Sequence, residues 1–120
     1  MTLYAIGLNH TTAPVAIRER VTFGPDIVVA ALRNLSEQAG VKESVILSTC
    51  NRTEFYCSAG EDDAERLRAW LGGFHGLELN DIAPYLYQYR GNHAVAHLLS
   101  VASGLDSLVL MKKPSFSIFI

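Results

Sequence analysis

Apolar residues recur along this chain with two spacings, one typical of strands and the other typical of helices. Short apolar or alternating runs predict strands at residues 3–8, 43–49, 53–59 and 85–89. Helical spacing predicts a short helix from Pro14 to Arg20, one helical turn at 77–83, and longer helices at 28–39, from the acidic cluster 61–63 to Gly76, and from Asn92 onward. Gly40 stands where the C-terminal cap of the first long helix is expected.

The order of these elements is strand, helices, two strands, helix, strand, helix. This order resembles a split βαβ (ferredoxin-like) arrangement, in which helices cover an antiparallel sheet, and it places the chain in the α+β class. At 120 residues, of which 49% are hydrophobic, the chain has enough apolar content for one core and no room for a second domain.

The run at 53–59 predicts a half-buried strand. Phe55 and Cys57 alternate with Glu54, Tyr56 and Ser58, so the first two residues are expected to face the core and the other three to face away from it. Cys57 is therefore interpreted as a structural residue beside Phe55.

Two further expectations concern helix faces. The third long helix carries an apolar stripe that is expected to pack on the sheet, formed by Val95, Leu98, Leu99 and Ala102. His75, near the end of the second long helix, is expected to face solvent.

Charge and cysteine content limit the classes of function. A formal net charge of -2 and a pI near 6.0 give no basic field over the whole chain, so nucleic acid would bind through a local patch or through another part of a larger protein. Two cysteines only seven positions apart, without a signal peptide, indicate reduced thiols in a cytoplasmic protein. No stretch is long enough to span a membrane.

Candidate chemistry gathers in residues 48–54, where an apolar strand gives way to a thiol, hydroxyls, an amide and a guanidinium. The charge of Arg52 favours the thiolate of Cys50, which is the nucleophilic form, and a guanidinium can also hold a carboxylate through two parallel hydrogen bonds. The alternative is that Cys50 is a small buried hydrophobe at the end of a strand.

The histidines leave more than one interpretation open. His97 can be a proton carrier or a residue on the polar edge of an amphipathic helix. His93 and His97 share a helix face, yet no nearby acid or cysteine completes a metal site, so no metal is expected. His10 follows the first strand and either lines a site or serves a turn with Asn9.

Four stretches of the chain, in order, resemble the N-terminal catalytic domain of the glutamyl-tRNA reductase family. These stretches are residues 7–14, 18–20, 47–54 and 101–110. The resemblance covers residues 1–110 and implies that the chain is a fragment, without the NADPH-binding and dimerisation domains of that family.

The resemblance implies a reaction and roles for named residues. In the family, a cysteine attacks the ester of glutamyl-tRNA, and NADPH reduces the resulting thioester to glutamate 1-semialdehyde for tetrapyrrole synthesis. The matching nucleophile is Cys50, and His97 matches a histidine that polarises the ester or moves a proton to the leaving ribose oxygen. The matching substrate contacts are Thr49, Asn51, Arg52 and Ser107. The implied partners are glutamyl-tRNA and, in the full-length family, a second copy in a homodimer; NADPH binds to the full-length enzyme and not to this chain.

The sequence departs from the family in two places. Ser100 stands where the family usually has a basic residue, and residues 111–120 resemble nothing in the family, which continues with a Gly-Glu-Pro-Gln motif. This tail suggests a premature end, a shifted reading frame or an added segment. Because it is uncharged after Pro114 and rich in strand-forming residues, we expect it to pair with a sheet edge or to lie over exposed apolar surface.

Two other classes of function compete with the family interpretation. An unrelated thiol acyltransferase would use the same Cys50 and His97 without tRNA. A non-catalytic binding or regulatory module would hold Cys50 buried in its core.

Overall fold

The computed structural model describes residues 1–39, 41, 43–112 and 116–119, with side chains described for 1–37, 41 and 43–103. Its elements, in chain order, are β1 (Thr2–Asn9), α1 (Val15–Arg20), α2 (Val28–Ala39), β2 (Ser44–Thr49), β3 (Arg52–Ala59), α3 (Ala64–Phe74), α4 (Leu79–Ile82), the 3₁₀ helix η1 (Ala83–Tyr85), β4 (Tyr87–Arg90), α5 (Asn92–Lys112) and β5 (Phe116–Phe119).

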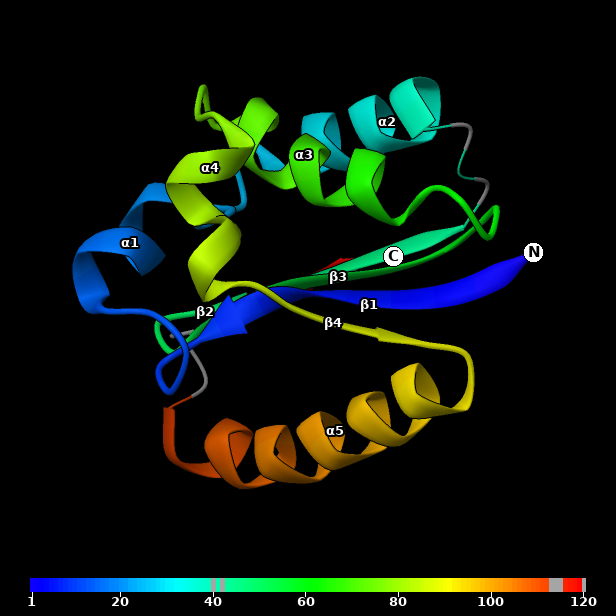
Figure 1. The fold of residues 1–120 in the computed structure, drawn as a ribbon. Helices are drawn as coiled ribbons and strands as arrows, with labels where there is room; N and C mark the ends of the chain where they lie inside the picture. The colour runs from blue at the N-terminus through cyan, green and yellow to red at the C-terminus, as the bar shows by residue number, and fades with distance from the viewer. Residues whose placement is uncertain (40, 42, 113–115, 120) are drawn as a thin grey trace.

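The strands form one sheet with helices on both faces. Every pairing is antiparallel, and the order across the sheet is β4-β1-β3-β2-β5. Helices α2 and α3 cover one face and α5 crosses the other (Figure 1). The chain is therefore an α+β domain, as the sequence predicts.

The face under α2 and α3 holds the main apolar core. Alternate residues of β1 (Tyr4, Ile6 and Leu8) are fully buried there, together with Phe55 of β3. The Phe55 ring meets Trp70 of α3 edge-on, with 5.2 Å between ring centroids. Cys57 is buried in the same cluster, which confirms the predicted structural position beside Phe55.

The other face of β3 is buried as well, so the prediction of a half-buried strand is wrong. Glu54 is 0% exposed and Tyr56 is 3% exposed, because α5 covers the face that the alternation assigned to solvent. Period-two alternation identifies which residues share a face, but it does not show whether a later helix covers that face.

The predicted packing stripe of the third long helix is also wrong. Val95 and Leu99 are 44% and 64% exposed, and Leu98 and Ala102 are exposed too. The residues that face the sheet are Ala94, His97 and Val101, spaced i, i+3 and i+7. Because a histidine occupies the centre of this face, the helical spacing of apolar residues indicated the neighbouring stripe, which is exposed.

Two smaller expectations are corrected by local packing. His75 is half-buried rather than solvent-facing, because its ring packs on Phe23 with 4.6 Å between ring centroids. The fourth strand begins at Tyr87 instead of Tyr85, since Pro84 and its neighbours form η1. Gly40, the expected helix cap, lies outside the described residues.

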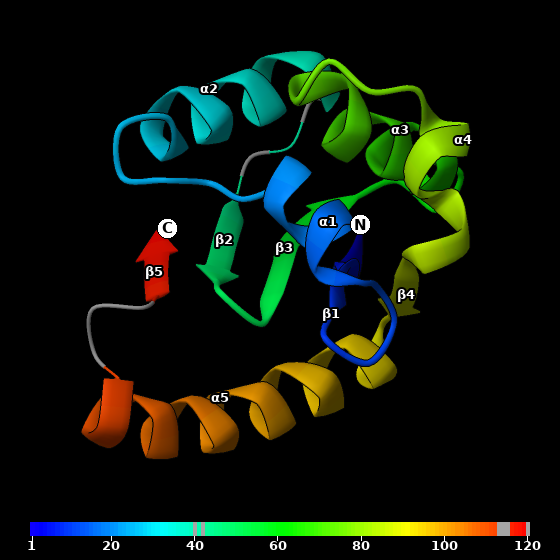
Figure 2. The same ribbon diagram turned by 90° about the vertical axis from the view of Figure 1, so that its left-hand side faces the viewer.

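The tail forms a strand on the free edge of β2. Strand β5 pairs antiparallel with β2, from Phe116 opposite Thr49 to Phe119 opposite Ile46 (Figure 2). This pairing confirms the expectation that the tail joins a sheet edge.

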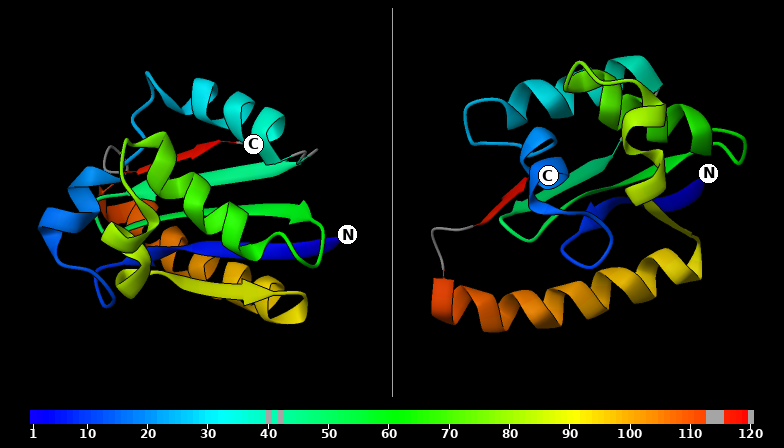
Figure 3. Two further views of the ribbon diagram at one scale, coloured as in Figure 1. Left: turned by 45° about the horizontal axis from the view of Figure 1, so that its top comes forward. Right: turned by 60° about the vertical axis from the view of Figure 1, so that its left-hand side comes forward.

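Helix α1 and the loop before it lie at the end of the sheet where β1 ends and β2 turns into β3 (Figure 3). This end carries the residues 48–54 that the sequence singles out. Among the described helices, none is long and apolar enough to cross a membrane.

Candidate active site

Cys50 and Asn51 form the turn between β2 and β3. The hydroxyl of Thr49 accepts hydrogen bonds from the backbone N–H groups of Asn51 and Arg52, both at 3.1 Å, and so fixes the shape of the turn. The Cys50 side chain is exposed, which excludes the interpretation of Cys50 as a buried core residue. Thr49 is 6% exposed, so its hydroxyl serves the turn in this structure.

A groove of about 410 Å³ separates the turn from α1. Its walls are formed by Val15, Arg18, Glu19, Thr22, Cys50 and Asn51. The Arg18 guanidinium is held in place because its Nη1 donates to the carbonyl oxygen of Ala13 at 2.8 Å. The structure therefore places a fixed cation and a carboxylate across the groove from the thiol, which the sequence spacing did not indicate.

On the α5 side of the same strands, hydrogen bonds converge on the buried carboxylate of Glu54. Its Oε1 accepts from the Tyr56 hydroxyl at 2.5 Å, and its Oε2 accepts from Arg52 Nη1 at 3.2 Å and from the Tyr87 hydroxyl. The Nε2 atom of His97 lies 3.0 Å from the same Oε2. We call these five residues (Arg52, Glu54, Tyr56, Tyr87 and His97) the Glu54 cluster.

Gly7 makes room for the Glu54 cluster. It lies in β1 between Glu54 on β3 and Tyr87 on β4, to both of which it is paired in register. A Cβ atom at position 7 would lie 2.3 Å from the Thr53 carbonyl oxygen and 2.4 Å from the Glu54 Cβ. Only glycine lets β1 approach β3 this closely and lets the Tyr87 hydroxyl reach across to Glu54.

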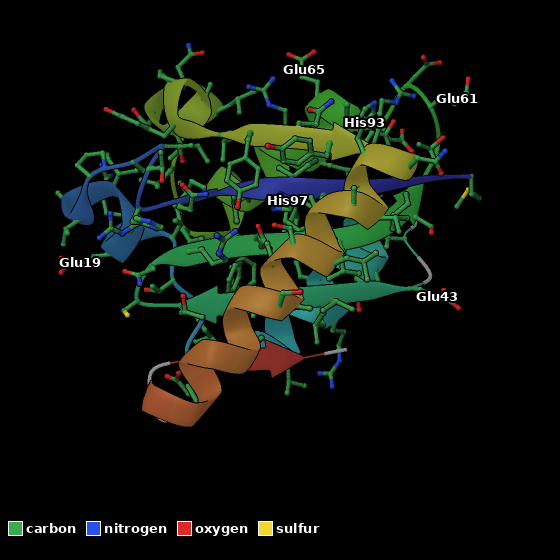
Figure 4. All side chains as sticks on the ribbon, turned by 90° about the horizontal axis from the view of Figure 1, so that it is seen from below. Glu19, Glu43, Glu61, Glu65, His93 and His97 are labelled. Carbon is green, nitrogen blue, oxygen red and sulfur yellow. The ribbon has the colours of Figure 1, made fainter. Side chains whose placement is uncertain are left out.

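Aromatic rings fix the orientation of His97. The imidazole stacks on the Tyr89 ring at 4.5 Å between centroids, with an interplanar angle of 24°, and contacts Tyr87 at 5.1 Å. Only 15% of the His97 side chain is exposed, and it points from α5 to the sheet (Figure 4). His93, one turn earlier, is exposed. Among the residues with described side chains, no group of three or more His, Cys, Asp or Glu could hold a metal ion.

Burial shifts the acid–base properties of the tyrosines in this cluster. Desolvation raises the pKa of Tyr56 and of Tyr87 far above the ordinary tyrosine value, and the negative charge of Glu54 raises both further. Both hydroxyls therefore stay protonated and act as donors to the carboxylate. Burial, with a smaller contribution from the charge of Asp63, also raises the pKa of the Cys57 thiol to about 12, so Cys57 is an inert core thiol.

The structure divides the predicted site residues into two groups. Cys50 and Asn51 line the groove beside α1, whereas Arg52 and His97 meet at Glu54. Within the described side chains, no hydrogen bond or ring contact joins Cys50 to His97.

The remaining predicted residues lie outside both groups. Ser107 lies in α5 beyond the described side chains. His10 is exposed after β1, where the Asn9 Oδ1 atom accepts from the N–H groups of Thr11 and Thr12 at 2.9 and 3.1 Å and so shapes the turn.

Sequence reasoning missed Glu54 and Tyr87 as members of the site. The available signal was the spacing of Arg52, Glu54 and Tyr56, which places two charges and a hydroxyl on one face of a strand. A carboxylate in the middle of an otherwise apolar central strand needs buried partners, and those partners are what the structure supplies.

A larger hollow of about 750 Å³ lies near the opposite end of β2. Its lining includes Ser44, Val45 and Tyr56, the last of which belongs to the Glu54 cluster, but not Cys50 or His97. The thiol and the imidazole therefore lie at the smaller groove and in the Glu54 cluster, away from the larger hollow.

Comparisons with known proteins identify the family of the chain. A family model described as "Glutamyl-tRNAGlu reductase, N-terminal domain" matches residues 6–113. Two curated relatives, both named glutamyl-tRNA reductase, come from Shewanella baltica (54% identical) and Pseudoalteromonas translucida (49% identical). Each match covers 92% of this chain and 26% of the relative, so the chain spans about a quarter of their length.

A solved structure from the same family has a similar fold. Glutamyl-tRNA reductase from Methanopyrus kandleri is similar over 89% of this chain and 23% of its own length, with a TM-score of 0.64 and 36% sequence identity. On the sequence match and the shared fold, the chain belongs to the family of glutamyl-tRNA reductase N-terminal domains.

Proposed function

We propose that this domain transfers the glutamyl group of glutamyl-tRNA to Cys50, which is the acyl-transfer half of the glutamyl-tRNA reductase reaction. The observation that carries the proposal is the exposed Cys50 thiol at a hydrogen-bonded turn, two positions before Arg52, whose Nη1 is already anchored. The names of the relatives supply the substrate, glutamyl-tRNA.

The transfer is a single exchange at the ester carbonyl. The Cys50 thiolate attacks the carbonyl carbon, a carbon–sulfur bond forms, and the bond from that carbon to the ribose oxygen of the tRNA breaks. The leaving oxygen takes a proton, for which we propose the Nδ1–H group of a doubly protonated His97 ring as the donor. His97 and Cys50 are not in contact in this structure, so the substrate has to span the distance between them. We also retain Ser107, Thr49 and Asn51 as proposed substrate contacts.

Arg52 is the proposed receptor for the side-chain carboxylate of the glutamyl group. Its contacts with Glu54 and Tyr87 both use Nη1, and among the described residues neither Nη2 nor Nε makes a hydrogen bond. A guanidinium has five N–H donors, so the edge formed by Nη2 and Nε can bind a second carboxylate in the two-pronged geometry. Such a receptor would discriminate against glutamine, which would leave the Nη2 and Nε edge of the guanidinium without a charged partner.

The described residues do not fit NADPH, the reductant that the family uses. Dinucleotide sites use a glycine-rich turn from a strand into a helix within a parallel βαβ unit. Here every strand pairing is antiparallel, and the first strand-to-helix connection, residues 10–14, contains no glycine. We therefore propose that reduction to glutamate 1-semialdehyde, a step of tetrapyrrole synthesis, belongs to the parts of the longer relatives that this chain does not cover. A thioester formed on this chain would then be hydrolysed to free glutamate.

Three broader assignments accompany this proposal. The strand order β4-β1-β3-β2 and the element order support a split βαβ, ferredoxin-like architecture for residues 1–110, with 111–120 as a separate tail. The free cysteines support a cytoplasmic location. Homodimerisation is proposed only for the full-length protein.

The test is incubation of the chain with glutamate-charged tRNA, followed by intact-mass analysis. We expect a glutamyl adduct on Cys50 and none in Cys50→Ser, because a hydroxyl is a far weaker nucleophile than a thiolate at neutral pH. The matched control is Cys57→Ser, which alters the buried thiol and is expected to keep the adduct if it folds. Equal deacylation of the tRNA by the unmodified chain and by Cys50→Ser would disprove the role of Cys50.

A further inference from the structure

Glu54 makes contacts that differ from those of an ordinary buried carboxylate. Its side chain is fully buried in the centre of the sheet. Its partners include Arg52 and His97, both of which are candidate site residues, and two tyrosine hydroxyls. Removing a carboxylate from water is costly unless donors surround it. Here two of the donors come from other elements: β4, which lies beyond β1 in the sheet, supplies Tyr87, and α5 supplies His97.

The chemistry of these donors fixes the state of His97. Tyr56, Tyr87 and Arg52 all donate to Glu54, so the carboxylate acts only as an acceptor at this point. An imidazole nitrogen 3.0 Å from such an oxygen has to carry a proton. In the neutral ring the proton therefore lies on Nε2, and Nδ1 is left with its lone pair.

We propose that Glu54 is the positioning residue of this site: its Oε2 atom fixes His97 in the Nε2–H tautomer and anchors Nη1 of Arg52. This arrangement leaves Nδ1 of His97 and the outer edge of Arg52 for the substrate. The proposal rests on the proposed acyl transfer for its consequence in activity, but the tautomer is a property of the free protein. Glu54 acts through its two neighbours and not on the reacting atoms.

Geometry supports a positioning role in two further ways. Stacking on Tyr89 holds the His97 ring against rotation, so the contact with Glu54 selects one nitrogen rather than alternating between the two. The Oε2 atom also serves both Arg52 and His97, so a single atom sets the relative placement of the carboxylate receptor and the proton carrier.

The direct test is the protonation pattern of the His97 ring. Long-range proton–nitrogen correlation spectra of the nitrogen-15-labelled chain distinguish the two tautomers of a neutral imidazole. The signals of His97 are assigned by their loss in His97→Asn. We expect the proton of the neutral ring on Nε2 in the unmodified chain. A neutral ring with its proton on Nδ1 would overturn the proposal, and this measurement needs no variant of Glu54.

A second test uses Glu54→Gln, which keeps the shape and removes the charge. We expect the rate of glutamyl transfer to Cys50 to fall at least about tenfold, since a charged hydrogen-bond acceptor for Arg52 and His97 is lost. The matched control is Glu61→Gln, the same change at an exposed site away from His97, as Figure 4 shows, and it is expected to keep the full rate. An unchanged rate in a folded Glu54→Gln would contradict the proposal.

The two tests separate this inference from the proposed function. If the unmodified chain forms no adduct, the acyl-transfer proposal fails, while the tautomer measurement still decides what Glu54 does to His97. If the chain forms the adduct and the tautomer or the Glu54→Gln rate contradicts expectation, the function stands and the positioning role fails.

Discussion

The two faces of the sheet are built from the same strands in opposite ways. The face under α2 and α3 is a continuous apolar cluster, in which rings such as Phe55 and Trp70 interlock. Among the residues with described side chains, the face under α5 has two small apolar clusters and is organised around one buried carboxylate. Neighbouring residues of β3, Glu54 and Phe55, face the two environments.

The difference indicates that the face under α2 and α3 mainly stabilises the fold, whereas the face under α5 mainly positions the site residues. Apolar burial is non-directional and tolerates small changes, whereas a buried hydrogen-bonded cluster needs each donor in place. Stability should therefore respond mainly to changes on the first face, and activity mainly to changes on the second.

The largest expected effect is the loss of Phe55 from the apolar face. Phe55→Ala should lower the free energy of unfolding by about 4 kcal/mol, because it removes a buried ring and leaves a cavity. The matched change under α5, Val101→Ala, should cost about 2 kcal/mol because the side chain is smaller. Urea titration followed by far-UV circular dichroism gives both values. Equal costs would show that the two faces contribute alike to stability.

The next effect comes from Gly7 in β1, which lies between the two strands that carry the cluster. Gly7→Ala should lower the free energy of unfolding by about 3 kcal/mol, because the new methyl group would overlap backbone atoms of Thr53 and Glu54 that have little freedom to move. Gly73→Ala is the control, since nothing lies within 4 Å of its added methyl group and a helical alanine should stabilise by about 0.5 kcal/mol. A neutral Gly7→Ala would mean that the sheet relaxes around position 7.

The apolar face could be predicted from sequence almost completely. Residues 3–8 and the stripe Leu67, Trp70, Leu71 and Phe74 gave the correct elements, because burial on one face produces a regular period. The polar face could be predicted only in part. Its helix carries a histidine at the buried centre and leucines outside, so the hydrophobic period selected the wrong stripe.

The candidate site shows the same limit. Cys50 and Arg52 could be found because they lie two positions apart in sequence and are chemically distinctive. Glu54 reads as a surface residue until α5 covers it, and Tyr87 becomes its partner only through the register of β4 on β1. Contacts between residues 33 positions apart depend on strand order, which local pattern does not encode.

A smaller effect is expected at Arg52 and concerns selectivity more than stability. Arg52→Lys should reduce the preference for glutamyl-tRNA over glutaminyl-tRNA about tenfold, because a point charge loses one prong of a two-pronged carboxylate contact. The rates of adduct formation on Cys50 with the two charged tRNAs measure this preference. Unchanged selectivity in Arg52→Lys would assign carboxylate recognition to another residue, for which Arg18 in the groove is the next candidate.

The smallest effect is a pH dependence that also separates the two faces. Burial raises the pKa of Cys57, on the apolar face, to about 12 from an ordinary value of 9.0, so the folded chain keeps a proton that the unfolded chain releases. The stability from this group is complete below pH 9 and is lost as the pH rises from 9 toward 12. Between pH 9 and 10 the loss should be about 1 kcal/mol. Cys57→Ala should remove this part of the slope, whereas Cys50→Ser should keep it.

Tyr56 and Tyr87 on the polar face, with pKa values raised from 10.0, add a loss of stability of the same sign that dominates above pH 10. Urea titrations at each pH distinguish the two contributions, and an identical slope in Cys57→Ala and the unmodified chain would show that Cys57 titrates normally in the fold.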